Sequence, residues 1–107
     1  MRKESTTIAR AFLKGRAAKQ ARTTTDGQAV YLHGNRIAWR DQAGDIHMTL
    51  CGWSTRTTRD RLNAICTLLM DTRPFHQKKT VQYFNDNEIG VREEVVVHTL
   101  EVTNGAE

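Results

Sequence analysis

The stretch AVYLHGNRIAWRDQAGDIHMTL, residues 29–50, decides the fold of this 107-residue chain. Apolar and polar residues alternate along it in three short runs, which is the pattern of half-buried β-strands. The pair Gly34-Asn35 separates the first two runs and is typical of a tight hairpin turn, and residues 41–45 form a second, polar link. Links this short join antiparallel strands. The stretch therefore predicts a three-stranded antiparallel meander.

The alternation also divides the side chains of the meander between two faces. We expect the apolar face to cover the core, and we expect Tyr31 to point to the opposite face. The expected core positions in the meander are Val30, Leu32, Ile37, Trp39, Met48 and Leu50.

A core helix is predicted after the meander. Thr57 or Thr58 can cap its start, and the helix is expected to stop near Asp71 because Pro74 prevents its continuation. The spacing of its apolar residues places them on one side, toward the sheet. These residues are Leu62, Ile65, Leu68 and Leu69.

Weaker patterns flank the meander and the core helix. Apolar residues at helical spacing predict an N-terminal helix over residues 5–20. Residues 80–84, 89–91 and 94–102 have the β-branched and aromatic composition of strands. We expect a C-terminal hairpin in this region that extends the same sheet.

These elements predict one α+β domain spanning residues 1–107, with frayed ends at 1–4 and 103–107. Residues 94–102 are expected to form an exposed edge strand. Because two such edges can pair across a two-fold axis, a homodimer is one predicted assembly.

Charge is unevenly distributed along the chain. Residues 1–80 contain 15 Lys and Arg against six Asp and Glu, a net charge of +9, whereas residues 81–107 contain one Arg against six acids, a net charge of −5. This asymmetry indicates either an anionic partner for the first part or attraction between the two parts. Arginine outnumbers lysine by 11 to 5, which favours bidentate recognition of phosphates or carboxylates.

The sequence lacks the motifs that identify several classes of protein. The longest apolar run, residues 29–32, is far too short for a membrane span or a signal peptide, so we expect a cytoplasmic protein whose Cys51 and Cys66 are free thiols. The histidines and cysteines have no metal-site spacing. No nucleophile elbow or phosphate loop is present. We therefore expect neither an enzyme, nor a cofactor, nor a metal site.

Two motifs resemble those of a known group of proteins. The first is Leu32-His33-Gly34-Asn35-x-Ile37-Ala38, and the second is Gly52-Trp53-x-Thr55-x-Thr57-Thr58. They resemble small, largely uncharacterised proteins encoded by bacteriophages or prophages, in which such a hairpin precedes the start of such a helix. The resemblance spans residues 30–66. It implies a phage protein acting in the cytoplasm of a bacterial host cell, and it brings no established activity or catalytic residue.

Nucleic-acid binding is the function that the charge pattern favours. Arginines neutralise phosphates, and exposed aromatic rings stack on bases, although each of these residues also fits an ordinary surface or core position. No motif for sequence-specific readout is present. We therefore predict a non-enzymatic, phage-type binding protein acting on nucleic acid or on a nucleic-acid-handling host complex. The candidate contact residues are Tyr31, Arg36, Arg40, Trp53, Arg56, Arg59 and Arg61.

Direct binding of a host protein is the alternative. Arg, Trp and Tyr are also the usual anchors of protein interfaces. Under this alternative the chain inhibits a host protein, for example as an anti-defence protein of the anti-CRISPR kind.

Overall fold

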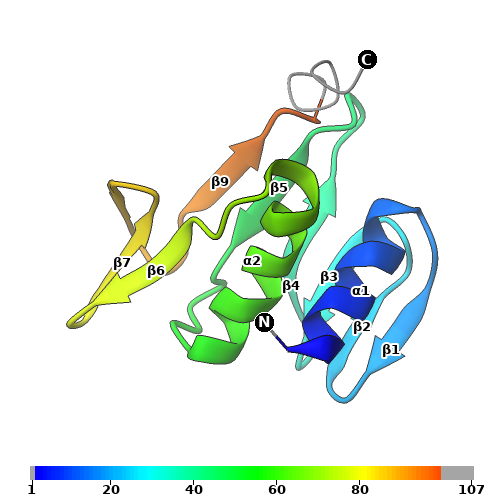
Figure 1. Ribbon diagram of the computed structural model, residues 1–107, viewed down its shortest axis with the longest axis horizontal. Helices are drawn as coiled ribbons and strands as arrows, with labels where there is room; N and C mark the ends of the chain where they lie inside the picture. Colours follow the sequence, from blue (N-terminus) through cyan, green and yellow to red (C-terminus); the bar gives the residue numbers. More distant parts are fainter. Residues whose placement is uncertain (1, 100–107) are drawn as a thin grey trace.

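The computed structural model describes residues 2–99 and has an α+β architecture (Figure 1). The helix α1 begins at Lys3, so it starts inside the segment 1–4 that we expected to be frayed. Residues 103–107 lie outside the described residues. The elements follow the order α1 (Lys3–Leu13), β1 (Ala18–Gln20), β2 (Thr23–Thr25), β3 (Ala29–Leu32), β4 (Asn35–Arg40), β5 (Ile46–Thr49), α2 (Arg56–Met70), β6 (Phe75–Lys78), β7 (Val81–Phe84), β8 (Asn87–Ile89) and β9 (Glu94–Val97).

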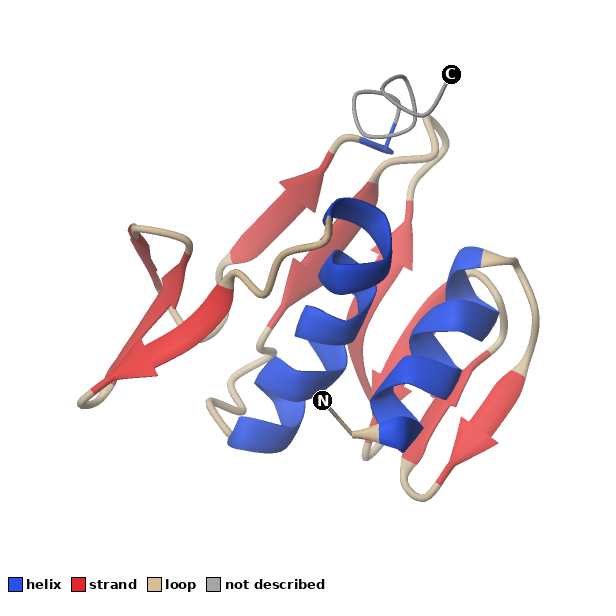
Figure 2. Cartoon of the chain, in the orientation of Figure 1, coloured by secondary structure: helices blue, strands red, loops and turns tan. Residues whose placement is uncertain are grey.

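Two antiparallel sheets organise the molecule. The main sheet has six strands in the order β1-β2-β3-β4-β5-β9, and the second sheet has three in the order β6-β7-β8. Both helices lie on the same face of the main sheet (Figure 2). A single buried apolar cluster joins these layers, with Phe12 from α1, Met48 from the main sheet, Ile65 from α2 and Phe75 from the second sheet. The main sheet thus buries one face under the helices.

The meander is confirmed as β3-β4-β5, but its first turn lies one residue earlier than predicted. The residues between β3 and β4 are His33 and Gly34, with φ angles of 52° and 80°. A two-residue turn with positive φ at both positions has the type I′ twist that matches the twist of antiparallel strands. Asn35 is therefore the first residue of β4 and not part of the turn.

A β-bulge interrupts the pairing of β3 with β4. Val30 pairs with Ala38, but Tyr31 pairs with Arg36, so β4 has one extra residue, Ile37, at this point. Ile37 and Ala38 are consecutive, and both are buried. The strict alternation that the sequence pattern assumed therefore breaks at Ile37.

The bulge overturns the predicted position of Trp39. Because Ala38 occupies the core face, Trp39 turns to the opposite face, where it is half-buried. Its indole stacks on His47 of the neighbouring strand, with a centroid distance of 5.3 Å and an angle of 12° between the rings. Trp39 is therefore not a core residue under the helices.

The N-terminal helix is shorter than the predicted residues 5–20. Gly15 has a φ of +71°, a conformation that glycine adopts without a steric penalty. The backbone nitrogen of Arg16 donates to the Ala11 carbonyl at 2.8 Å, and that of Gly15 donates to the Phe12 carbonyl at 3.0 Å. This pair of bonds is a Schellman motif, which ends α1. The chain then turns back and forms β1 and β2, a hairpin that we did not predict.

The core helix is confirmed as α2, with a different cap. The helix begins at Arg56, and Thr55 caps it by accepting a hydrogen bond from the backbone nitrogen of Thr58 at 3.2 Å. Asp71 ends it in a left-handed conformation with a φ of 57°. The end before Pro74 therefore agrees with the prediction, whereas the predicted cap at Thr57 or Thr58 is wrong.

One of the expected core positions of α2 faces solvent. Leu62 and Ile65 are buried as predicted, and Leu69 packs against the same cluster, but Leu68 is 42% exposed. The buried Cys66 takes its place. Residues 62, 65, 66 and 69 follow the helical spacing i, i+3, i+4 and i+7, and position 68 falls outside this stripe.

The C-terminal strands divide between the two sheets. β6, β7 and β8 do not extend the main sheet but form a separate one, and only β9 joins the main sheet, beside β5. Asn63 of α2 holds β6 in place: its Nδ2 donates to the Phe75 carbonyl at 2.9 Å, and its Oδ1 accepts from the Phe75 backbone nitrogen at 2.8 Å. β9 lies at the edge of the main sheet, as expected of a strand that could pair with a second copy. The homodimer itself stays a prediction. Residues 100–102 of the predicted final strand lie outside the described residues.

Candidate functional site

A polar stripe of α2 faces the second sheet. Arg56, Arg59, Asp60 and Asn63 follow the spacing i, i+3, i+4 and i+7, which places them on one side of a helix. This side lies next to β6, because Asn63 bonds the backbone of Phe75 there. The space between α2 and the second sheet is therefore lined by charged side chains on its helical wall.

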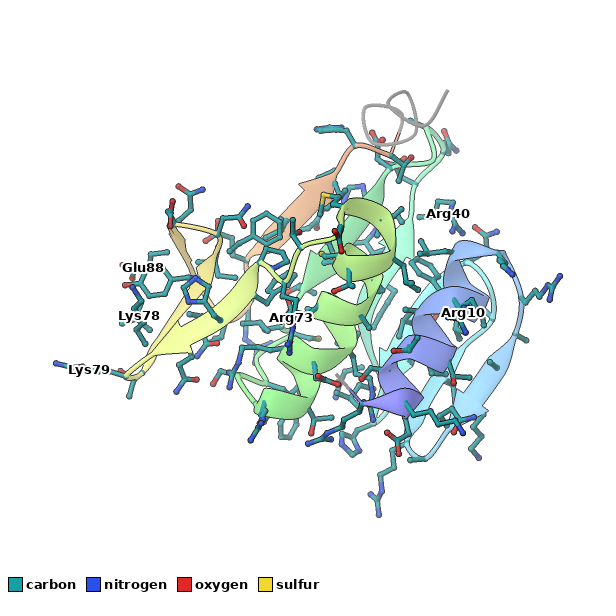
Figure 3. All side chains as sticks on the ribbon, viewed as in Figure 1. Arg10, Arg40, Arg73, Lys78, Lys79 and Glu88 are labelled. Atoms are coloured by element: carbon teal, nitrogen blue, oxygen red, sulfur yellow. The ribbon has the colours of Figure 1, made fainter. Side chains whose placement is uncertain are left out.

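A groove of about 750 Å³ occupies this space. We call it the basic groove, because four arginines and one lysine line it against a single carboxylate. Within residues 2–99, these five cations have no carboxylate within 4.0 Å. Figure 3 shows Arg73 between α2 and the second sheet, and Lys79 at the tip of the β6–β7 hairpin. The lining residues are Arg2, Arg56, Arg59, Asp60, Asn63, Arg73, Phe75, His76, Gln77 and Lys79.

Arg59 is fixed in the groove by neutral acceptors. Its Nη1 lies 3.1 Å from the Ser54 carbonyl oxygen, 3.0 Å from the Gln77 Oε1 and 3.1 Å from the Gln82 Oε1. Burial, together with the nearby charge of Arg56, lowers the pKa of Arg59, although an arginine remains protonated at neutral pH. These acceptors orient the guanidinium without cancelling its charge.

The one carboxylate of the groove is directed elsewhere. Asp60 accepts a hydrogen bond from the Ser5 hydroxyl of α1. Its Oδ2 also lies 3.7 Å from the Nη1 of Arg61, a residue that does not line the groove. Asp60 is therefore bonded to α1 and lies close to Arg61, and the five cations outnumber this carboxylate in the lining of the groove.

Arg61 does not occupy the surface position that we expected. It is 6% exposed. Its Nε donates to the Thr23 hydroxyl at 2.8 Å, and its Nη1 donates to the Ser5 hydroxyl. Burial lowers its pKa. Arg61 thus joins α1, α2 and β2 and is not available to a ligand.

Arg40 also has a contact role inside the protein. Its Nη1 donates to the Gly27 carbonyl at 2.8 Å, and its Nη2 donates to the Phe12 carbonyl at 3.0 Å. Its guanidinium lies 4.8 Å from the centroid of the Phe12 ring. Arg40 therefore holds the end of α1 against the sheet, and this position does not fit the predicted contact with a partner.

Tyr31 and Arg36 lie on the face of the main sheet that the helices leave uncovered. They pair across β3 and β4, and the guanidinium carbon of Arg36 lies 4.0 Å from the centroid of the Trp39 indole. The Trp39–His47 stack continues this row onto β5. Tyr31 therefore points away from the core, as predicted. Trp39 lies on the same uncovered face, which was not predicted.

His47 forms the end of this row, between two carboxylates. Its Nε2 lies 2.7 Å from the Asp41 Oδ2, and its Nδ1 bonds the Glu94 carboxylate of β9. The hydrogen bond to Asp41, followed by the one to Glu94, raises the pKa of His47, and the same contact with His47 lowers the pKa of Asp41. His47 thus connects β5 to the edge strand β9.

Trp53 lies in the loop between β5 and α2 and is 54% exposed. It lines a second cavity of about 210 Å³, which we call the Trp53 cavity. The other lining residues are Leu32, His33, Ile37, Thr55, Thr57 and Thr58. The two cavities are separate, so the structure divides the seven candidate residues among the basic groove, the Trp53 cavity, the uncovered sheet face and the interior.

Three cations of the groove were missing from our candidate residues. Arg2 comes from the N-terminus, Arg73 from the α2–β6 connection and Lys79 from a hairpin tip. These three positions share no regular spacing in the sequence. They come together only because the separate second sheet places β6 beside α2. The one signal in the sequence was the basic excess of residues 1–80.

Within residues 2–99, no group of three His, Cys, Asp or Glu side chains gathers as metal ligands. Burial raises the pKa of the Cys66 thiol to about 12, which keeps it protonated and unreactive. No helix among these residues has the length and apolar character needed to cross a membrane.

A comparison with protein-family models places the chain in a family. The model described as the Kyanoviridae Gp96 protein matches residues 1–104. The chain belongs to this bacteriophage family. The Gp96 match confirms the phage origin that the two motifs predicted, and it extends well beyond residues 30–66. No curated protein and no solved structure matched the chain.

Proposed function

We propose that this Gp96 family member is a non-enzymatic protein that binds the phosphate backbone of nucleic acid in its basic groove, in the cytoplasm of the infected host cell. The observation that supports the proposal is the gathering of five cations around one concave surface. Concave surfaces lined by one sign of charge concentrate the field and attract ligands of opposite charge.

The arrangement of the cations favours a polyanion over a single phosphate. They come from the N-terminus, from the first turns of α2, from the α2–β6 connection and from the hairpin tip at Lys79, so they are spread around the groove and not gathered at one point. A nucleic-acid strand presents several phosphates in succession, which can meet cations spread in this way. Four of the five cations are arginines, which can form two parallel hydrogen bonds with one phosphate.

The salt dependence of binding tests the proposal. The affinity for a fluorescein-labelled DNA or RNA strand is measured by anisotropy between ~50 and ~200 mM salt. If the strand contacts about four of the cations, the logarithm of the affinity should fall against the logarithm of the salt concentration with a slope of about −3. Salt-independent binding, or no binding at low salt, would contradict the proposal.

A matched pair of double variants localises the binding. The double variant Arg56→Ala/Arg73→Ala removes two exposed cations of the groove. It should weaken binding and make the slope of the salt dependence less steep by about 1.4. The control is Arg10→Ala/Arg16→Ala, which removes the same charge from exposed residues outside the groove. Figure 3 shows Arg10 on α1, away from Arg73. Equal losses in the two variants would show that only the overall charge matters.

Inhibition of a host protein by direct binding is the second candidate, and the uncovered face of the main sheet supports it. Tyr31, Arg36 and Trp39 are residue types that anchor interfaces, and Val96 of β9 is 38% exposed at the edge of this sheet. Capture from a host lysate treated with nuclease tests this candidate. A stoichiometric host protein that Arg36→Glu releases and Arg56→Ala/Arg73→Ala retains would favour inhibition over nucleic-acid binding.

A further inference from the structure

The Trp53 cavity has the features of a site for a flat, partly apolar group. The buried side chains of Leu32 and Ile37 form part of its wall, and three threonines add polar groups. Trp53 lines it while 54% of the residue remains exposed. The exposed part of the indole offers a face on which an aromatic ligand in this cavity can stack.

The cavity adjoins the basic groove across the first turn of α2. Arg56 lines the groove, whereas Thr55 and Thr57, its two neighbours in the chain, line the cavity. The Nη1 of Arg2, another groove residue, lies 3.3 Å from the Thr57 hydroxyl oxygen. A ligand that crosses this turn therefore meets cations on one side and an aromatic cavity on the other.

We infer that the Trp53 cavity takes one unstacked base of a single-stranded nucleic acid whose backbone follows the basic groove. The inference rests on the proposed function. Every base has a π-face that stacks on an aromatic side chain, so this contact does not require a particular sequence. The adjoining cations select a phosphate-bearing ligand over an uncharged apolar peptide. In a duplex the bases are stacked and paired, so they cannot enter without being flipped out.

Fluorescence of Trp53 tests the inference directly. The Trp39→Phe protein has Trp53 as its single tryptophan, and it is titrated with a single strand, a duplex of equal length and a strand of equal length with abasic sites. The single strand should quench Trp53 and bind about tenfold more tightly than the abasic strand. The duplex should leave the Trp53 emission unchanged.

Two variants separate the cavity from the groove. Trp53→Ala should abolish the preference for the intact strand over the abasic one while the abasic strand binds as before. Arg56→Ala/Arg73→Ala should weaken the binding of both strands alike. Trp53 is largely exposed, so its truncation leaves the buried core intact.

The outcomes distinguish the two proposals. Equal affinity for all three ligands, unaffected by Trp53→Ala, would overturn the base site and leave backbone binding in the groove standing. Absence of binding to every ligand at low salt would overturn both. A response of Trp53 to a tyrosine-containing peptide, without any response to the strand, would overturn the base site in favour of a protein ligand.

Discussion

Arg59 and Arg61 are two positions apart, yet their guanidinium groups meet different surroundings. Arg59 faces the basic groove with Arg56, whereas Arg61 is buried beneath α1. Each residue advances a helix by about 100°, so two positions separate their directions by about 200°. Position 61 falls on the same side as the buried Thr58, Leu62 and Ile65. Helical spacing alone does not settle its burial, because Leu68 lies seven positions further along nearly the same line of the helix and is 42% exposed. The contacts with α1 and β2 are what bury Arg61.

The buried position of Arg61 makes it a stability residue. We expect Arg61→Met to lower the free energy of unfolding by about 2–4 kcal/mol, because the Thr23 hydroxyl loses its partner and Asp60 loses the neighbouring positive charge. Urea denaturation measures this change. The exposed control Arg10→Met should change it by less than about 0.5 kcal/mol. Equal stability of the two variants would contradict the role assigned to Arg61.

His47 should make stability depend on pH. Asp41 and Glu94 raise its pKa above the ordinary value, so the folded state holds its proton more tightly than the unfolded state. This contribution is complete below the unfolded pKa of about 6.5 and is lost as the pH rises through the higher pKa of the folded state. The difference in Tm between wild type and His47→Asn should therefore shrink as the pH rises from about 6 toward 9.

A matched histidine controls for the general effect of pH. His33 lies in the β3–β4 turn and is exposed, and asparagine tolerates its positive φ of 52°. His33→Asn should follow wild type in parallel over the same pH range. A constant difference between wild type and His47→Asn would show that the imidazolium contributes nothing to folding.

At the scale of elements, turns and strand spacing were predictable because their causes are local. The β3-β4-β5 meander and the end of α2 before Pro74 follow from neighbouring residues. The end of α1 was also encoded, since Gly15 is the residue type that a Schellman motif favours, but the predicted helix over residues 5–20 continued past it. No residue type in the sequence indicates the bulge at Ile37, and it is this bulge that moves Trp39 out of the core.

Paired leucine and isoleucine variants measure the corrected orientation of α2. Ile65→Ala should lower the free energy of unfolding by about 2–5 kcal/mol, because Ile65 is 1% exposed and its truncation leaves a cavity. Leu68→Ala should cost less than about 1 kcal/mol, because Leu68 is 42% exposed. Thermal or urea unfolding distinguishes the two. Similar losses would restore the original expectation that both residues face the sheet.

At the scale of the whole molecule, the site depends on a feature that the sequence did not predict. The basic groove exists because the second sheet stands beside α2 and does not continue the main sheet. Strand composition identified the segments of this region, but composition does not determine which edge a strand pairs with. Two arginines of the groove, Arg56 and Arg59, were therefore among the candidate residues, whereas the opposite wall of the groove was not predicted.

Asn63 is a buried link between α2 and the second sheet. Its amide makes two hydrogen bonds to the backbone of Phe75 in the buried boundary between α2 and β6. Asn63→Ala leaves the N–H and C=O of Phe75 without these partners, so we expect the free energy of unfolding to fall by about 2–4 kcal/mol. Because the break lies between α2 and the second sheet, amide hydrogen exchange should accelerate more in β6, β7 and β8 than in β3, β4 and β5. Asn87→Ala, at an exposed position of β8, is the control and should leave this pattern unchanged. Uniform acceleration across both sheets after Asn63→Ala would mean that they unfold as one unit, and that the groove does not depend on this single contact.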